Sequence, residues 1–341
     1  MKVWGIHMGE KVGSSPLEKN YVAIGWHTMG DLRPCSGSRE QLKEALLKTF
    51  PDIKKGAVAG NAGVLFRFVN SIQRDDIVIY PSKTDRMVNI GRVTGDYHYV
   101  EHDEHEYPNQ RSIVWLGSFP RSDFSQAALH EIGAFITLFT VQRHAAEFLN
   151  KVNLSASLEH SLATNLSEAD DDTDTTDDDT ATENIAVQAV QTTEDFIIKQ
   201  LHSKLDGYEF EYFVAHLLEC MGYKARVTLK SGDGGVDIIA HKDELGFEPP
   251  IIKVQCKKST AQNGEPDANQ LLGALGEGEY GLFVNLGSYS RPARLLERNK
   301  AKLRLIDGDE LVNLVLEHYA RLSPKYRVLL PLKQIYVADL A

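Results

Sequence analysis

The chain has 341 residues, enough for two domains, and a formal net charge of −11. No apolar run reaches the roughly 18–20 residues that a membrane span requires, and the N-terminal residues lack a signal-peptide core. The three cysteines, Cys35, Cys220 and Cys256, have no paired spacing. This argues against a disulfide framework or a cysteine-based zinc site and favours the reducing cytoplasm.

Residues 1–150 are rich in predicted strands. β-Branched and aromatic runs punctuated by Gly, Asp and Pro predict strands in "NYVAIGW", "DIVIYPS", "MVNIGRVTGDYHYV" and "SIVWLGSF". Two helices are expected. One covers 38–50, where Ser38 and Gln41 have the spacing of a capping box, and the other covers 125–141, which is mostly apolar.

An acidic stretch follows this unit. Residues 167–184 include nine acidic residues and no basic one, and without them the net charge is −2. Low hydrophobicity and like charge predict a disordered linker, because such a stretch cannot bury enough apolar surface to offset ordering entropy. We place this flexible region at 153–192, between folded units at 1–150 and 194–341.

The second unit alternates between helices and strands. The pattern predicts an αβββαβ order with an additional αβα, forming a mixed sheet flanked by helices. The fold class is therefore α/β (α+β). The expected elements are helices at 206–221, 266–276, 291–302 and 307–319, and strands at 223–229, 236–240, 251–257, 280–287 and 303–306.

Polar groups on two of these strands form a candidate site. Strand alternation in 251–257 places Gln255 and Lys257 on one face. A hairpin from the neighbouring strand brings Asp237 close to them. Glu211 borders the apolar face of its helix, from which it can reach the sheet. Two carboxylates, one amide oxygen and one ammonium group therefore surround a single point.

This combination suits phosphodiester hydrolysis. The reaction uses a hard cation, usually Mg²⁺ and in some cases Mn²⁺, held by oxygen ligands. Asp237, Glu211 and Gln255 supply such oxygens, and Lys257 can orient a water molecule and offset developing charge. Gly232, Gly234 and Gly235 in the preceding turn allow close approach to a phosphate. Each residue alone also fits a structural role, such as a turn aspartate or a solvated edge lysine, but their joint occurrence favours a site.

The stretch "FEYFVAHLLECMGYKARVTLKSGDGGVDIIA", followed by "IIKVQCKK", "QLLGAL" and "GLFVN", resembles the Mrr-like branch of the PD-(D/E)xK nuclease superfamily. In that branch a glutamine replaces the second acidic residue of the motif, written D…QxK. The resemblance covers 194–319 and implies a DNA endonuclease of restriction or antiviral-defence type. It implies catalytic roles for Asp237, Gln255 and Lys257, with Glu211 supplied by the preceding helix.

Two further acidic residues belong to this resemblance. Glu209 is a rival for the helical position, although only Glu211 directly follows Phe210. Asp307, in "LIDGDEL", is expected to cap a helix. The basic run 291–304 carries six basic residues and one acid. Its Arg294, Arg298 and Lys302 are expected to contact the DNA backbone.

In the first unit, the runs are "VAIGW", "DIVIYPS", "IGRVTGDYHYV" and "VWLGSFPRSD". They are similar, more loosely, to the EVE and PUA-like β-barrel modules, which bind nucleic acid and often hold a flipped modified base in an aromatic pocket. A flipped base requires flat aromatic walls and a few polar groups. Trp26, Tyr97 and Trp115 are the candidate walls for contact with DNA, together with Tyr99, and Asp96 and Arg92 are candidate polar contacts. The alternative is that these aromatic residues form the core of the barrel.

Histidines follow one of the predicted strands. His98, His102 and His105 lie among acidic residues, so both a metal site and a solvated acidic loop fit the pattern. Strand spacing by itself does not produce tetrahedral geometry.

The sequence therefore predicts a Mg²⁺-dependent endonuclease that acts on double-stranded DNA, with its N-terminal unit selecting modified bases. A homodimer fits the need to cut two strands. Two alternatives stay open: a defence effector whose N-terminal unit senses a small ligand or a protein partner, and a non-catalytic DNA-binding protein.

Overall fold

The computed structural model describes residues 1–83, 85–101, 103–104, 106–133, 136–154, 178–228, 235–243, 246, 248 and 250–334, with side chains except at residues 10 and 178–188. The chain forms two compact units that divide between Val190 and Gln191, inside helix α7 (Asp178–Lys204). Within this described part of the chain, no helix has the length and apolar content that a membrane span requires.

Helix α7 covers the last part of the stretch 153–192 that was expected to be disordered, so the structure differs from the expectation there. The helix ends inside a core, where Ile197 and Leu201 are fully buried. A helix anchored in this way can propagate into a polar sequence, because adding a residue costs less than starting a helix. Residues 155–177 lie outside the described part, and for them the flexible linker stays a prediction.

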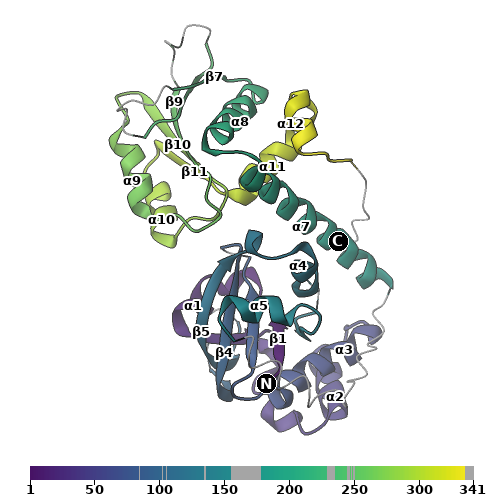
Figure 1. Ribbon diagram of the computed structural model, residues 1–341. Helices are drawn as coiled ribbons and strands as arrows, with labels where there is room; N and C mark the ends of the chain where they lie inside the picture. The colour runs from purple at the N-terminus through teal and green to yellow at the C-terminus, as the bar shows by residue number, and fades with distance from the viewer. Residues whose placement is uncertain are drawn as a thin grey trace. The chain divides into compact units, whose positions relative to one another are not determined.

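The first unit contains a six-stranded sheet in the order β2-β5-β4-β3-β1-β6, which curls into a half-barrel (Figure 1). All its strand pairs are antiparallel except β1 with β3. The four expected strands are present as β2, β3, β4 and β5. The strands are β1 (Val3–Ile6), β2 (Tyr21–Ile24), β3 (Ile77–Pro81), β4 (Met87–Tyr99), β5 (Asn109–Pro120) and β6 (Leu138–Thr140).

Helices cover both faces of this sheet. One core contains side chains of α2 and α3, and the other contains those of α4 and α5. The expected Ser38 cap is confirmed, since its side chain accepts a hydrogen bond from the Gln41 N–H at 3.2 Å. The helices are α1 (Ser15–Lys19), α2 (Arg39–Thr49), α3 (Lys55–Phe66), a π-helical turn (Arg67–Ser71), α4 (Gln126–Ile132) and α5 (Ala145–Lys151).

The expected helix at 125–141 is wrong beyond Ile132. Helix α4 ends there, and Leu138–Thr140 form the edge strand β6, which pairs with β1. The N–H of the C-cap residue Gly133 bonds to the Leu129 carbonyl and closes the helix. The apolar run beyond it contains β-branched and aromatic residues that suit a strand.

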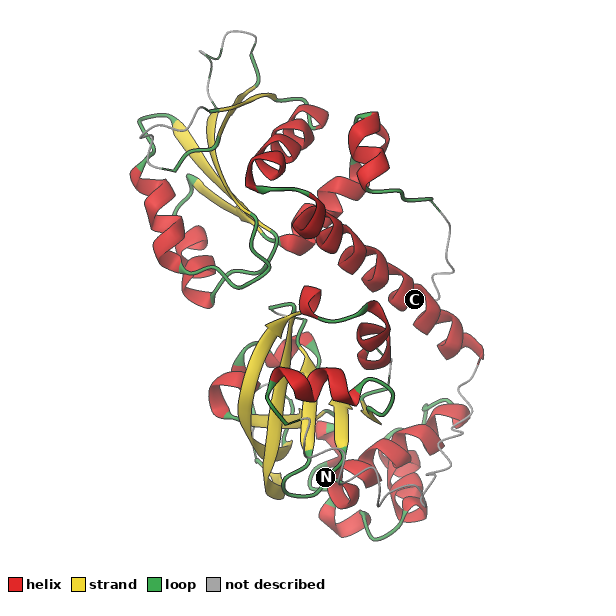
Figure 2. Cartoon of the chain, in the orientation of Figure 1, coloured by secondary structure: helices red, strands yellow, loops and turns green. Residues whose placement is uncertain are grey.

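The second unit contains a five-stranded sheet in the order β11-β10-β9-β8-β7. Strands β9, β10 and β11 are parallel, whereas β7, β8 and β9 are antiparallel. The expected αβββαβ order and the mixed α/β class are confirmed (Figures 1 and 2). The strands are β7 (Lys224–Val227), β8 (Ile238–His241), β9 (Ile251–Lys257), β10 (Glu279–Asn285) and β11 (Leu303–Ile306).

Each face of this sheet has its own core. The helices α7, α8 and α11 bury Phe210 and Leu311 against one face, and α9 and α10 bury Leu271 and Ala293 against the other. The helices are α8 (Gly207–Cys220), α9 (Glu265–Gly273), α10 (Arg291–Asn299), α11 (Gly308–Glu317) and α12 (Pro324–Leu329).

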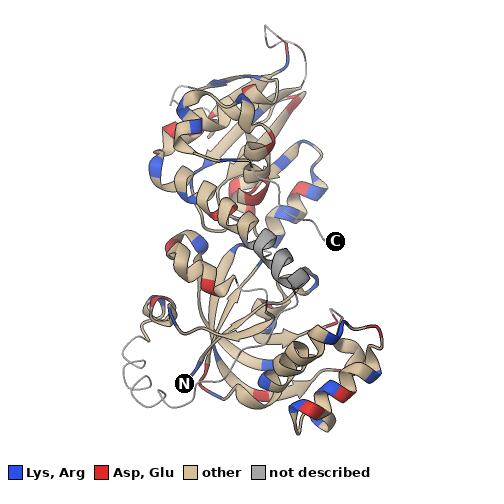
Figure 3. Ribbon diagram, turned by 90° about the vertical axis from the view of Figure 1, so that its right-hand side faces the viewer, with Lys and Arg blue, Asp and Glu red and all other residues tan. Residues whose placement is uncertain are grey.

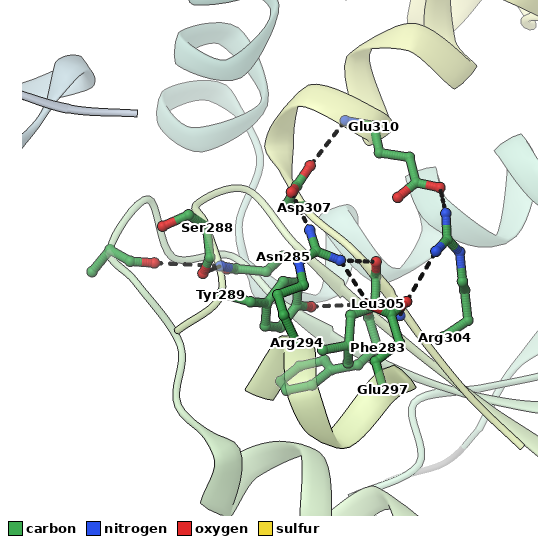
Figure 4. A network of polar contacts seen from close by, with 11 residues as sticks. Phe283, Asn285, Ser288, Tyr289, Arg294, Glu297, Arg304, Leu305, Asp307 and Glu310 are labelled. Atoms are coloured by element: carbon green, nitrogen blue, oxygen red, sulfur yellow. Dashed lines mark hydrogen bonds and ion pairs between the residues drawn. The ribbon is translucent and has the colours of Figure 1, made fainter. Parts of the chain in front are cut away.

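Arg294 holds α10, β11 and α11 together (Figure 4). Its guanidinium group donates to the Leu305 carbonyl at 2.9 Å and to Glu297 at 3.0 Å, and it also pairs with Asp307. Asp307 caps α11 as expected, because its Oδ1 accepts from the Glu310 N–H at 3.0 Å. Arg294 is therefore committed to the fold, and its expected DNA contact conflicts with these partners.

We predict that Arg294→Gln destabilises the protein by about 1–3 kcal/mol, because it leaves the partly buried Asp307 carboxylate without its cation and removes the donors to Glu297 and the Leu305 carbonyl. Arg298→Gln is the matched control. It makes the same charge change on the same helix at an exposed position, and should alter stability by at most about 0.5 kcal/mol. Chemical denaturation measures both. Equal losses would show that Arg294 does not hold these elements together.

Candidate active site

Helix α8 carries two acidic candidates, Glu209 and Glu211, and their surroundings differ. Asp206 and Glu209 form a capping box: the Asp206 Oδ1 accepts from the Glu209 N–H at 2.8 Å, and the Glu209 Oε2 accepts from the Asp206 N–H at 2.9 Å. Glu209 is therefore used in starting the helix. Glu211 is half-buried and directly follows the fully buried Phe210. The structure favours Glu211 as the helical acid.

Asp237 is fixed against the backbone of β9. Its N–H donates to the Val254 carbonyl at 2.8 Å, and its Oδ2 accepts from the Cys256 N–H at 2.7 Å. The antiparallel ladder between β8 and β9 begins at the next residue, Ile238, which pairs with Val254. The carboxylate therefore lies beside the peptide group that joins Gln255 to Cys256, as the predicted hairpin required.

The side chains of β9 alternate between the two cores. Val254 and Cys256 pack on the face covered by α8. Gln255 and Lys257 lie on the face covered by α9, where a Cβ on Gly235 would approach the Gln255 Nε2 to 3.1 Å. Gly235 has a φ of +88°, a conformation that suits glycine, and the residues 229–234 before it lie outside the described part.

The side-chain oxygen of Gln255 shows whether this site suits a metal. Its Oε1 is buried and, within the described residues, has no hydrogen-bond donor. A buried amide oxygen without a partner is costly unless another ligand satisfies it. A hard cation can satisfy this oxygen, because such ions prefer carboxylate and amide oxygens as ligands. Asp237 and Gln255 therefore fit a Mg²⁺ or Mn²⁺ site.

The thiol of Cys256 is influenced by two carboxylates, those of Asp237 and Glu211. Burial raises the pKa of its thiol, and the negative charges of Asp237 and Glu211 raise it further. Both carboxylates therefore lie within electrostatic reach of one sulfur atom on β9. The thiol stays protonated at neutral pH. Glu211 belongs to α8, on one face of β9, whereas Gln255 and Lys257 occupy the α9 face, so the expectation that all four groups surround a single point stays a prediction.

Lys257 has a partner that the sequence did not reveal. Its Nζ lies 3.0 Å from the Asp267 Oδ2, in the first turn of α9. Among the described residues, no group of three His, Cys, Asp or Glu side chains is arranged to hold a metal. A cation here therefore depends on the amide oxygen of Gln255. His102 and His105 lie outside the described residues, so the histidine site stays untested.

The remaining basic candidates on the second unit differ from Arg294. Arg298 and Lys302 are exposed, and α10 ends at Asn299, so Lys302 lies beyond the helix rather than on it. Lys, Arg, Asp and Glu positions are interspersed on both units (Figure 3). Contact between DNA and these two residues stays a prediction.

The three aromatic candidates of the first unit are all half-buried against its core. The Tyr97 hydroxyl donates to the Asn109 Oδ1 at 2.6 Å and accepts from the Leu32 N–H at 3.0 Å. The Trp115 Nε1 donates to the Pro16 carbonyl at 3.0 Å. These two side chains therefore have structural roles.

Trp26 differs from the other two. Its φ of +60° is uncommon for a bulky residue. Strained backbone of this kind often occurs at functional positions, because the surrounding structure must hold it there. Of the three aromatic residues, Trp26 is the strongest candidate for contact with a ligand.

The two units match two different family models. Residues 202–315 match a family model described as "Restriction endonuclease", and residues 4–142 match one described as "Domain of unknown function (DUF8426)". Over 123 residues the chain is 30% identical to the type IV methyl-directed restriction enzyme EcoKMrr of Escherichia coli (strain K12). That match covers 34% of this chain and 40% of the relative, so the chain spans less than half of that enzyme.

Two solved structures overlap more loosely. The MspJI restriction endonuclease in complex with a 27-mer oligonucleotide has a TM-score of 0.32 and 16% identity, over 75% of this chain and 61% of that one. The DNA modification-dependent restriction endonuclease AspBHI has a TM-score of 0.33 and 11% identity, over 83% and 69%. Scores this low do not establish a shared fold.

The matches to the first unit name neither EVE nor PUA-like modules, so that resemblance stays a prediction. The second unit has both the Gln-x-Lys strand and the family match. Residues 202–315 are therefore similar to the restriction endonuclease family in both the motif and the family model.

Proposed function

We propose that the chain is a metal-dependent endodeoxyribonuclease that cuts double-stranded DNA carrying modified bases. One observation supports this most strongly. At the end of β9, the Asp237 carboxylate accepts from the Cys256 N–H, and the Oε1 of the adjacent Gln255 is buried without a donor among the described residues. Lys257 follows on the same face of the strand as Gln255, within the residues that match the restriction endonuclease model.

Mg²⁺ is the proposed cofactor, with Mn²⁺ as a substitute. Asp237 and Gln255 would hold it, with Glu211 as a third oxygen ligand. When bound, such an ion polarises the phosphoryl oxygen and lowers the pKa of a water molecule. Lys257 is exposed and keeps two further N–H donors beside the one given to Asp267, so it can orient the water and offset charge on the phosphate.

We infer that the first unit selects the DNA. The relative EcoKMrr is described as methyl-directed, which supports a modified target for this chain as well. Trp26 supplies an aromatic face for an extruded base, and Arg298 and Lys302 contact phosphates. A homodimer would bring two active sites to the two strands and stays a prediction.

We predict that the protein cuts DNA with Mg²⁺ or Mn²⁺ and not in the presence of a chelator. Asp237→Asn and Glu211→Gln should each lower the single-turnover rate by roughly 10²-fold or more, because each removes a charge fixed near the reacting centre. Glu219→Gln is the matched control for Glu211. It makes the same change at an exposed position of α8 and should leave the rate unaffected.

Cutting that persists in chelator would refute the metal mechanism. Full activity of Asp237→Asn would refute the site. If no DNA is cut under any condition while DNA binding is intact, the protein is a non-catalytic DNA-binding protein.

We predict that the full-length Asp237→Asn variant binds a methylated duplex more tightly than the same duplex without methylation. Trp26→Ala should lower affinity for the methylated duplex about 5- to 150-fold, since stacking on one base contributes about 1–3 kcal/mol. Affinity for the plain duplex should stay unchanged, because phosphate contacts dominate it. Mobility-shift titrations measure both.

Trp115→Phe is the control for this test, because it removes the bond to Pro16 and should lower the melting temperature without changing the preference. If the Asp237→Asn variant bound the methylated and the plain duplex equally, the first unit would instead be assigned to sensing a small ligand or a protein partner.

A further inference from the structure

Two lysines of strand β9 bond to the two ends of helix α9. On one face of the strand, Lys253 and Lys257 lie on either side of Gln255. The Lys253 Nζ donates to the Ala274 carbonyl at 2.8 Å, at the end of α9, and the Lys257 Nζ donates to Asp267 at 3.0 Å, in its first turn. The helix is therefore attached at both ends to the strand that carries the candidate site.

Between these attachments the helix reaches the site again. A Cβ on Gly235 would lie 3.4 Å from the Gln270 Nε2 and 3.1 Å from the Gln255 Nε2. Asp267 and Gln270 are three residues apart, so they lie on the same side of α9. Helix α9 is therefore one wall of the candidate site.

The pair between Lys257 and Asp267 contributes little to stability. The two side chains are 45% and 35% exposed, and ion pairs this open contribute about 0–1 kcal/mol. The effect of the pair is therefore geometric. A lysine has a flexible four-carbon stem, and a fixed carboxylate restricts where its ammonium group can lie.

We propose that Asp267 is a positioning residue for Lys257. It holds the ammonium group at the end of β9, beside Gln255, and leaves two N–H donors for a phosphate oxygen or a water molecule. Asp267 acts through Lys257 and does not contact the DNA. The inference rests on the proposed nuclease function.

The test uses the full-length protein with Mg²⁺. Asp267→Asn should lower the single-turnover cleavage rate about tenfold, because a small displacement of a group near the reacting centre is costly. DNA affinity should stay unchanged. Glu265→Gln is the matched control. It removes the same charge from the same first turn of α9 and should change the rate less than about twofold.

A double-mutant cycle separates positioning from a general effect of the helix. In a Lys257→Ala background, Asp267→Asn should cause no further loss, since the group it positions is absent. Asp267→Glu, which keeps the carboxylate, should restore part of the rate. Equal rates for Asp267→Asn and Glu265→Gln, or additive losses in the cycle, would overturn the proposal.

A second readout does not depend on cleavage. In NMR spectra the two Hε protons of a fixed lysine give separate signals, and those of a freely rotating lysine merge. The Lys257 signals, assigned by their loss in Lys257→Ala, should be separate in the natural protein and merged in Asp267→Asn. Merged signals in both would overturn the proposal. Separate signals in a protein that cuts no DNA would instead uphold the pairing and refute the nuclease function.

Discussion

The second unit depends on one constraint, which is that β9 must present opposite side chains to two different helices. It lies between β8 and β10 and is hydrogen-bonded on both edges. Val254 and Cys256 face the apolar layer under α8. The other face carries Lys253, Gln255 and Lys257 towards α9, where the two lysines find polar partners. A shift in register of one residue would bury two ammonium groups against α8.

The carboxylate of Asp237 also depends on the position of β9. Asp237 lies just before the ladder begins and accepts the Cys256 N–H, so its charge is stabilised by a backbone donor. Lys258, the next residue after β9, donates to the carbonyls of His202 and Leu205 at the end of α7. The end of β9 is thus attached to α7 and to α9.

The placement of Asp237 and Gln255 relative to β9 followed from the sequence, because it rests on local rules. Alternation separates Gln255 from Cys256, and a short hairpin brings Asp237 beside them. Sequence did not reveal Asp267, because the 258–264 loop separates it from Lys257 and no spacing rule predicts that contact. It also did not reveal the structural role of Arg294, since a run of basic residues does not show that Asp307, thirteen residues away, pairs with the cation.

In the first unit the sequence identified the antiparallel strands β2, β3, β4 and β5 but not β1 and β6. Strand β1 pairs in parallel with β3, more than seventy residues away, and contains Gly5. Strand β6 continues an apolar run that begins in a helix. Periodicity cannot separate strand from helix in such short runs; only the tertiary pairing does.

Crystals of the protein soaked in Mn²⁺ offer the most direct test of the central claim, because anomalous scattering locates the ion without reference to activity. We expect a peak between the Asp237 carboxylate and the Oε1 of Gln255, at the roughly 2.0–2.2 Å typical of a small hard cation and its oxygen ligands. An ion bound elsewhere, or no ion at a concentration that supports cutting, would contradict the account of this site.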